Sequence, residues 1–249
     1  MGLITVEANI NYRKTKMKRA LMNWSGGKDS ALSLYHILQN KEYQVEHLLT
    51  SLNDSFKRVS MHGVREELLD QQALNIGIDL VKLRLAETVS MEEYQAKMAE
   101  TMQPLVDSGI KYSIFGDIFL EDLRQHREER LAQIGMKGVF PIWKRASLDI
   151  LDEFWDLGFK TVVVAINGNH LDKSFCGRIL DRDFVKDLPP TVDPCGENGE
   201  FHTFVFETPY FKNPIKFDIG ETVDKTYNFK NSDGEDLTST YFFTDLIPV

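Results

Sequence analysis

The chain has 249 residues, of which 42% are hydrophobic, and a formal net charge of −9. This length and composition allow one large or two modest domains with a sizeable core, and the acidic balance disfavours broad binding to nucleic acid or to an anionic membrane surface. Two cysteines, Cys176 and Cys195, imply no disulfide framework, and no apolar run has the length of a transmembrane helix. We therefore expect a cytoplasmic protein.

Residues 1–17 are predicted to be an N-terminal extension, because they contain no apolar segment typical of a signal peptide. Strand-like and helix-periodic runs alternate after it. The predicted strands are Arg19–Trp24, Val45–Leu52, Asp79–Leu85 and Tyr112–Gly116. Three of the predicted helices are Asp29–Gln39, Val64–Leu74 and Leu120–Gly135. A further helix is expected to begin after a cap at Thr88 or Ser90 and to run to Ser108, with a kink or early stop at Pro104. Such alternation predicts a doubly wound α/β domain with a parallel sheet over residues 18–142.

The composition changes in the last hundred residues, where turn formers cluster at 189–190 and 193–199. The elements expected here are a short strand or crossover at Gly138–Trp143, a helix at Ser147–Leu157 capped by Ser147, strands at Phe159–Asn167 and Phe201–Phe206, and short strands over 215–243 separated by Asn231–Gly234. This pattern predicts a smaller α+β domain over residues 143–249.

A glycine turn joins the first predicted strand to the first predicted helix, and its residues are Ser25, Gly26, Gly27, Lys28, Asp29 and Ser30. This geometry aims backbone N–H groups and the positive end of a helix dipole at one point, which suits a phosphate. Lys28 supplies positive charge, whereas Asp29 suits a magnesium ion or a helix cap. The spacing differs from Walker A and resembles the PP-loop of the ATP pyrophosphatases.

Two further polar pairs follow predicted parallel strands, namely Thr50 with Ser51 and Gly116 with Asp117. Ligands bind beyond the carboxyl ends of such strands, so we expect both pairs to share a crevice with the glycine turn. Thr50 and Ser51 would then lie by the adenine or ribose of a nucleotide, and Asp117 near its phosphates and metal. The alternative for Asp117 is a helix N-cap.

A second motif runs from Glu197 to Thr203, at a turn that enters a predicted strand. Alternation along the strand places Glu200 and His202 on one face, where they could bind an amine or ammonia, or move a proton. The alternative is a polar hairpin turn with an exposed strand.

For Cys195, a structural thiol is favoured over a nucleophile that carries sulfur. The sequence contains no CxxC or HxxxH spacing that would predict a zinc site.

Together, SGGKDS, the Gly116-Asp117 pair and CGENGEFHTFV resemble the diphthine–ammonia ligase family, over Met17 to about Phe211. The resemblance implies a PP-loop ATP pyrophosphatase fold of HUP-like type with a separate C-terminal domain. It implies that ATP activates a substrate carboxylate as an acyl-adenylate, and that ammonia then gives an amide, AMP and pyrophosphate. The implied cofactors are ATP and Mg²⁺. The implied acceptor is diphthine on elongation factor 2, or a small-molecule carboxylate in a bacterium.

The resemblance and the local chemistry together assign roles to individual residues. The candidates for catalysis are Lys28, Asp29, Glu200 and His202, and Asp29 and Asp117 are the candidates for metal binding. The nucleotide is assigned to Ser25, Gly26, Gly27, Lys28, Asp29, Ser30, Thr50, Ser51, Gly116 and Asp117. The acceptor or ammonia is assigned to Glu197, Asn198, Gly199, Glu200, His202 and Thr203.

Two other functions remain open at the level of sequence. One is a PP-loop enzyme that modifies tRNA, against which the acidic charge and the lack of a cysteine pair weigh. The other is an ATP-binding sensor without turnover, against which the intact Lys28, Asp29 and second motif weigh. The oligomeric state is also open, with a homodimer as one option.

Overall fold

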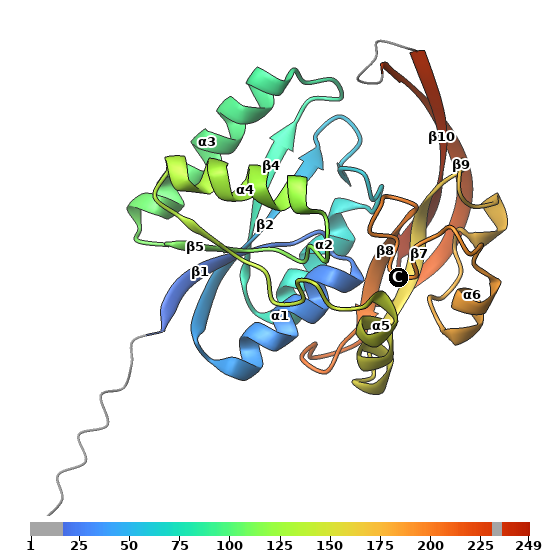
Figure 1. Cartoon of the computed structure of the whole chain (residues 1–249), viewed down its shortest axis with the longest axis horizontal. Helices are drawn as coiled ribbons and strands as arrows, with labels where there is room; N and C mark the ends of the chain where they lie inside the picture. The colour runs from blue at the N-terminus through green and yellow to red at the C-terminus, as the bar shows by residue number, and fades with distance from the viewer. Residues whose placement is uncertain (1–16, 231–235) are drawn as a thin grey trace, which may run out of the picture.

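The computed structural model describes residues 17–230 and 236–249. The extension up to residue 16 and the whole of the predicted turn Asn231–Gly234 lie outside the described residues. The described chain contains two β-sheets, each with helices packed against it (Figure 1).

The first sheet contains five parallel strands in the order β4-β2-β1-β5-β6. A short sixth strand, β3, pairs antiparallel with the last residues of β2. The sequence predicts the longer strands to within a few residues, but it does not predict β3, which is too short to show alternation. The bounds are β1 (Lys18–Asn23), β2 (Tyr43–Asn53), β3 (Arg58–Val59), β4 (Asp79–Leu85), β5 (Tyr112–Ile114) and β6 (Lys137–Val139).

Helices cover both faces of this sheet, which confirms the doubly wound architecture. Alternate side chains of β1 point to opposite faces: Ala20 and Met22 join the core formed with α1 and α2, whereas Leu21 joins the core formed with α3 and α4. The bounds are α1 (Lys28–Asn40), α2 (Glu66–Ile76), α3 (Met91–Asp107) and α4 (Glu121–Gln133).

Local signals explain several helix ends. The hydroxyl of Ser90 accepts a hydrogen bond from the Glu93 N–H, and the Glu93 side chain accepts one from the Ser90 N–H, so the predicted cap at Ser90 is confirmed as a capping box. Gly77, with φ of 81°, ends α2. The expected early stop at Pro104 is not observed, because α3 continues to Asp107.

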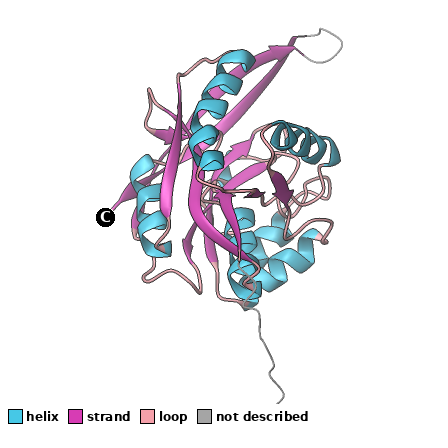
Figure 2. Cartoon of the chain, turned by 90° about the vertical axis from the view of Figure 1, so that its left-hand side faces the viewer, coloured by secondary structure: helices cyan, strands magenta, loops and turns pink. Residues whose placement is uncertain are grey.

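The second sheet is antiparallel, with the order β8-β7-β10-β9. Figure 2 shows β9 and β10 as a long two-stranded ribbon, where the sequence predicted several short strands. Neither the 3₁₀ turn nor α6 was predicted, because each is too short to show a helical period. The bounds are α5 (Ser147–Asp156), β7 (Lys160–Asn167), η1 (Lys173–Phe175), α6 (Arg182–Asp187), β8 (Phe201–Glu207), β9 (Phe217–Lys230) and β10 (Asp236–Pro248).

The predicted cap of α5 is wrong. The N-cap residue is Ala146 and makes no side-chain cap, whereas the hydroxyl of Ser147 donates instead to a carboxylate oxygen of Asp193, 2.5 Å away. The α+β character of this second part agrees with the prediction, and its boundary at residue 142 stays a prediction.

The free edge of β8 meets the glycine turn that precedes α1. The N–H of Val205 donates to the carbonyl of Gly26 (2.8 Å), and the side-chain amide of the buried Gln72 donates to the carbonyls of both residues (3.0 and 2.7 Å). One hydrophobic core runs from α1 and α2 into the second sheet and includes Leu68 and Phe204. The strand of the late motif is therefore packed directly against the glycine turn.

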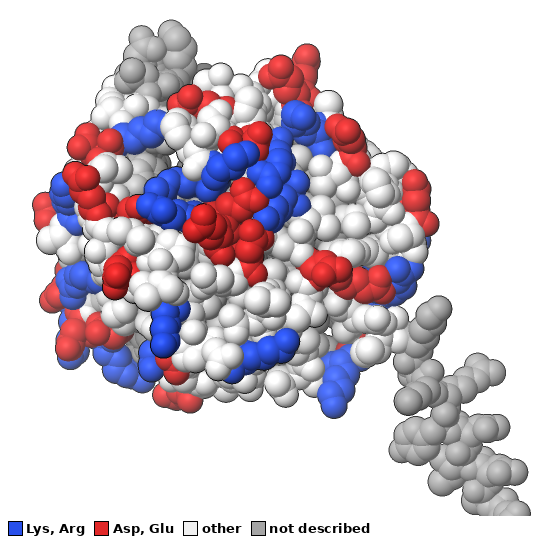
Figure 3. Space-filling model, turned by 180° about the vertical axis from the view of Figure 1, so that it is seen from behind, with Lys and Arg blue, Asp and Glu red and all other residues white. Residues whose placement is uncertain are grey.

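Charged side chains are intermingled on the face shown in Figure 3 and do not form one field of a single sign. Lys82 of β4 pairs with Glu66 and Asp70 of α2, and Arg84 pairs with Glu66 and Asp54. Within residues 17–230 and 236–249, no helix combines the length and the apolar character needed to span a bilayer.

The two leucines of α2 allow a matched test of the shared core. Leu68 is 0% exposed and Leu74 is 74% exposed. We expect Leu68→Ala to lower the free energy of unfolding by about 2–5 kcal/mol through lost burial and a residual cavity, and Leu74→Ala to change it by less than about 0.5 kcal/mol. Urea denaturation of both variants measures the difference, and equal losses would contradict the packing described for α2.

Candidate active site

A cavity of about 690 Å³ opens at the carboxyl edge of the first sheet. Its walls come from the glycine turn, from the ends of β1, β2 and β5, and from the late motif, as the sequence predicted for these segments. Three predicted site residues, Gly26, Asn198 and Glu200, are not part of the lining. Those that line it are Ser25, Gly27, Lys28, Asp29, Ser30, Thr50, Ser51, Gly116, Asp117, Glu197, Gly199, His202 and Thr203.

The conformation of the glycine turn depends on the buried Gln72. Gly26 has φ of +80°, and a Cβ there would lie 2.8 Å from the Gln72 side-chain oxygen. A larger residue would therefore have both an unfavourable backbone conformation and a steric clash with Gln72. The same oxygen accepts a hydrogen bond from the indole N–H of Trp24 (2.8 Å). Inside the turn, the Gly27 N–H donates to the hydroxyl of Ser25 (3.2 Å), which lies 3.2 Å from the hydroxyl of Ser30.

Lys28, from which the sequence predicts a positive charge at the turn, is only 3% exposed. Its Nζ donates to both carboxylate oxygens of Asp29, at 2.9 and 2.8 Å, and its backbone N–H donates to the hydroxyl of Thr203 (3.1 Å). Burial lowers the pKa of Lys28, but the carboxylate of Asp29 and other nearby acidic groups outweigh it and leave the pKa raised. Lys28 therefore stays charged, and Asp29 is its partner rather than the cap of α1, which is Gly27.

Gly116 allows the end of β5 to touch the start of α1. A Cβ at this position would lie 2.7 Å from the carbonyl carbon of Asp29 and 2.8 Å from the nitrogen of Ser30. Any larger residue would therefore push the loop after β5 away from the glycine turn. This contact explains in physical terms why a glycine precedes Asp117.

Asp117 forms an ion pair with Arg127 of α4, in which its Oδ2 lies 2.8 Å from Nε. The alternative role of Asp117 as a helix cap is not observed, because α4 begins at Glu121 after the cap residue Leu120. Arg127 lines the cavity, and its Cζ lies 4.5 Å from the ring centroid of Phe115. A positive charge thus reaches the cavity from a second helix.

Thr50 and Ser51 both lie at the carboxyl end of β2 and line the cavity. The hydroxyl of Thr50 is buried and has no hydrogen-bond partner among the described residues. An unsatisfied buried hydroxyl costs free energy, so a ligand group that bonds to it would be favoured here.

The turn of the late motif is organised by two carboxylates. Asp193 accepts hydrogen bonds from the N–H groups of Cys195 (3.1 Å) and Glu197 (3.0 Å). Glu200 accepts, through one oxygen, the N–H of Asp193 and the side-chain amide of Asn198, both at 3.0 Å. These bonds hold residues 193–200 as one compact wall of the cavity.

The prediction that Glu200 and His202 point together into the cleft is wrong for Glu200. Glu200 precedes β8, is 1% exposed and lies behind the wall, whereas His202 lines the cavity. Strand alternation did not apply, because the turn at Gly196 and Gly199, both with positive φ, precedes the regular strand.

Glu197 is the carboxylate that the late motif presents to the cavity. One of its oxygens accepts the N–H of Ile118 (2.7 Å), and burial raises the pKa of the carboxyl to about 7, with Asp29 and Asp117 adding to the increase and Lys28 opposing it. A carboxyl group with a pKa near neutrality can both take and give a proton.

Two imidazoles face each other in the cavity, with 4.6 Å between the ring centroids of His62 and His202. Nδ1 of His62 lies 3.2 Å from the carbonyl oxygen of Thr203, to which it donates. Burial, with a smaller contribution from the charge of Lys28, lowers the pKa of His62 to about 4 and holds that of His202 well below its ordinary value. Both rings are therefore neutral at pH 7. His62 was not among the predicted site residues, although it lies beside the turn-forming Gly63 soon after a strand end.

Cys195 also lines the cavity, but its environment is not that of a nucleophile. Its thiol donates to the carbonyl of Ser147 (3.4 Å), and burial raises its pKa to about 12 although Lys28 lowers it. The thiolate form is therefore suppressed, which agrees with the structural role favoured from the sequence.

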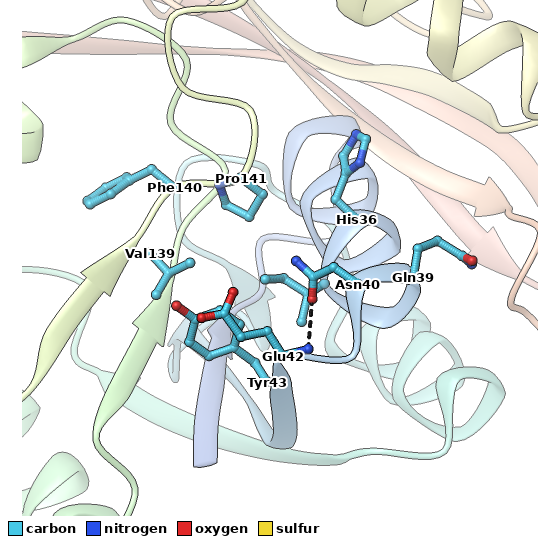
Figure 4. A pocket seen from close by; sticks show the side chains of 9 residues that line it. His36, Gln39, Asn40, Glu42, Tyr43, Val139, Phe140 and Pro141 are labelled. Carbon is cyan, nitrogen blue, oxygen red and sulfur yellow. Dashed lines mark hydrogen bonds between the residues drawn. The ribbon is translucent and has the colours of Figure 1, made fainter. Parts of the chain in front are cut away.

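A second hollow, of about 490 Å³, contains none of the predicted site residues. Figure 4 shows that its side chains come from the end of α1 and the start of β2 on one side, and from residues 139–141 on the other. Tyr43 begins β2, whereas Thr50 lies near the end of that strand, so the two hollows adjoin opposite ends of β2.

A parallel α/β sheet with a glycine turn at a helix N-terminus, facing a cavity at the carboxyl edge, is the arrangement typical of α/β domains that bind nucleotides. Comparison with known families is more specific. The model of the diphthamide synthase N-terminal domain matches residues 17–138, and that of the diphthamide synthase C-terminal domain matches residues 146–232. The chain belongs to the diphthine–ammonia ligase family.

Individual relatives named diphthine–ammonia ligase are similar to this chain at modest identity. The protein of Danio rerio is 30% identical over 110 residues, which cover 42% of this chain and 43% of that protein. The protein of Saccharomyces cerevisiae is 22% identical over 230 residues, which cover 76% of this chain and 33% of that protein. The protein of Homo sapiens is 27% identical over 110 residues. The match thus spans less than half the length of these relatives.

The raised pKa of Glu197 predicts a pH dependence of stability. The folded pKa of about 7 exceeds the ordinary value of 4.5, so the native state binds the proton more tightly and stability falls as pH rises from about 4.5 to about 7. Glu197→Gln keeps an acceptor for the Ile118 N–H and removes the titration. We expect the variant to lose less stability than the wild type over this window in urea denaturation at several pH values. Glu221→Gln, at an exposed position, is the control, and parallel curves for wild type and Glu197→Gln would contradict the assignment.

Proposed function

We propose that this chain is an ATP-dependent carboxylate–ammonia ligase, which forms an acyl-adenylate, releases pyrophosphate and then transfers ammonia to give an amide and AMP. The observation that carries the proposal is the single cavity that joins the glycine turn to the late motif, where the Lys28 N–H donates to the hydroxyl of Thr203 (3.1 Å). The family membership and the printed name of the relatives support the same chemistry.

The phosphate side of the proposed reaction is assigned to the glycine turn and α1. The N-terminus of α1 presents backbone N–H groups and a positive dipole end to the cavity. Lys28 is preorganised by Asp29, so its charge can stabilise the departing pyrophosphate without a large reorganisation. Arg127, which lines the same cavity, supplies a second positive charge.

Asp29 and Asp117 suit a magnesium ion that is held by few protein oxygens and mainly by substrate phosphates. Both carboxylates line the cavity. Burial raises the pKa of Asp117, Arg127 opposes this, and the negative charge of Asp29 adds to the increase. Across the described ranges, no cluster of three or more His, Cys, Asp or Glu side chains could hold a metal without such help. When bound, the ion would neutralise phosphate charge.

The ammonia side of the proposed reaction is assigned to Glu197, His202 and His62. When ammonia attacks the acyl carbon, the bond to the AMP oxygen breaks and the attacking nitrogen loses a proton. Glu197, with a pKa of about 7, is the group suited to take that proton. The neutral imidazoles can accept hydrogen bonds from ammonia, and the nearby Lys28 charge disfavours ammonium. Glu200 supports this wall from behind, so its proposed role changes from catalysis to positioning.

The proposed acceptor is the carboxylate of diphthine on elongation factor 2, as the name of the relatives suggests. A small-molecule carboxylate is the alternative for a bacterial source. The acceptor must reach the cavity wall formed by Glu197 and His202, which adjoins the glycine turn of the proposed phosphate site.

The nucleotide product tests the reaction class. With ATP, ammonium and an acceptor, we expect AMP and pyrophosphate, because the glycine turn differs in spacing from the Walker A loop. Chromatography of the nucleotides measures the ratio of AMP to ADP, with the acceptor omitted as a control. ADP as the main product would exclude the proposed adenylation.

Substitution of Lys28 tests the phosphate assignment. Lys28→Met keeps most of the buried stem but removes the charge, and we expect AMP formation to fall by at least ~10²-fold, in the range seen when a preorganised donor is lost. Lys160→Met, which removes an exposed lysine paired with Glu207, should leave the rate within about twofold. Circular dichroism confirms that both variants fold. Turnover equal to that of the wild type in folded Lys28→Met would rule out this role.

A further inference from the structure

A tight hairpin over residues 58–65 projects from the end of β2 into the cavity. The N–H of Val59 donates to the carbonyl of Val64 (2.8 Å), and the N–H of Gly63 donates to the carbonyl of Val59 (3.0 Å). The N–H of Ser60 donates to the carbonyl of Ser51 (3.0 Å), which fastens one side of the hairpin to the end of β2. The cavity-lining residues of this hairpin are Val59, Ser60, Met61 and His62.

The other side of the hairpin is fastened to β10 by a single carboxylate. Arg65 donates to Asp245 through Nε (3.0 Å) and Nη2 (2.6 Å), which is a forked pair. Nη1 of Arg58 donates both to Asp245 (2.8 Å) and to the carbonyl of Gly63 (2.7 Å). Arg65 and Arg58 together hold the pKa of Asp245 at about 2, although burial opposes them. Asp245 therefore connects both strands of the hairpin to the second sheet.

Packing supports the same attachment. Gly63 has φ of +71°, and a Cβ there would lie 2.8 Å from a ring carbon of Phe243, two residues before Asp245 on β10. The hairpin therefore rests on β10 at van der Waals distance in addition to its ion pairs. A glycine is required at the contact by both its backbone angle and the space available.

The hairpin places His62 against the late motif. His62 donates to the carbonyl of Thr203 and faces the ring of His202, as described above. Because the backbone around His62 is held at Ser51 on one side and at Asp245 on the other, the position of the imidazole depends on both attachments.

We infer that Asp245 is a positioning residue, which holds the 58–65 hairpin so that His62 lies in the cavity against His202. Asp245 itself does not line the cavity and acts through Arg58 and Arg65. It lies on β10, beyond residue 232, where the match to the diphthamide synthase C-terminal domain ends. The effect on catalysis rests on the proposed function, whereas the effect on the hairpin does not.

The alternative is an ordinary surface ion pair, which contributes little to stability. Three observations separate Asp245 from that case. One carboxylate serves two arginines, the side chain of Asp245 is only 21% exposed, and the contact joins segments about 180 residues apart.

Hydrogen exchange tests the attachment without any assay of activity. In Asp245→Asn, we expect the amides of Val59, Ser60 and Gly63 to exchange about tenfold faster, which corresponds to about 1.4 kcal/mol, while the amides of β1 stay protected. Asp187→Asn is the control, because it breaks an exposed ion pair with Arg178 (2.7 Å) that does not involve the hairpin. Arg58→Lys, which removes the shared donor but keeps the charge, provides a second variant if Asp245→Asn does not fold. Unchanged exchange of the hairpin amides in folded variants would overturn the inference.

Modification of histidines by diethylpyrocarbonate, read out by peptide mass spectrometry, reports on His62 directly. We expect His62 to react faster in Asp245→Asn than in the wild type or in Asp187→Asn, with the exposed His126 as an internal reference.

In the ligase assay of Asp245→Asn, we expect kcat to fall about tenfold while KM for ATP stays within twofold. An unchanged rate of His62 modification, or an unchanged kcat despite a mobile hairpin, would overturn the positioning role. A wild-type protein without ligase activity would count against the proposed function alone, and the exchange and modification data would still decide the role of Asp245.

Discussion

The contact between the edge of β8 and the glycine turn is the interaction on which the rest of the site depends. A strand edge carries unpaired backbone groups that must find partners, and β8 finds them in the carbonyl of Gly26 and the side chain of Gln72. Because the second sheet is attached at this point, the late motif and the glycine turn line the same cavity. Neither sheet alone would enclose it.

The features that could be predicted from the sequence are those that depend on a single local rule. The parallel strands, the capping box at Ser90 and the placement of Thr50, Ser51 and Asp117 at strand ends follow from periodicity and from the geometry of parallel sheets. The family resemblance also rests on contiguous motifs. These features involve residues that are close in sequence, so their arrangement can be read without knowing the tertiary contacts.

The errors share a different physical origin. Glu200 was assigned to the cleft because strand alternation was extended into a turn whose glycines have positive φ. Ser147 was assigned as a cap, but a carboxylate 46 residues away competes for its hydroxyl. Arg127 and His62 were missed because the contact that places each of them is not periodic: Arg127 pairs with Asp117 across the start of α4, ten residues away, and His62 contacts Thr203, 141 residues away. Tertiary contacts decide these positions, and no local pattern encodes them.

Trp24 gives the site an intrinsic optical reporter. It is one of three tryptophans in the chain, lies directly before the glycine turn, lines the cavity, and shares the side chain of Gln72 with the carbonyl of Gly26. A rearrangement of the turn that disturbs Gln72 would change the hydrogen bonding of the indole, and with it the emission of a chromophore shielded from water. The other two tryptophans, Trp143 and Trp155, do not line this cavity. The native chain thus carries a fluorophore coupled to its glycine turn, and no added label is needed to follow that turn in solution.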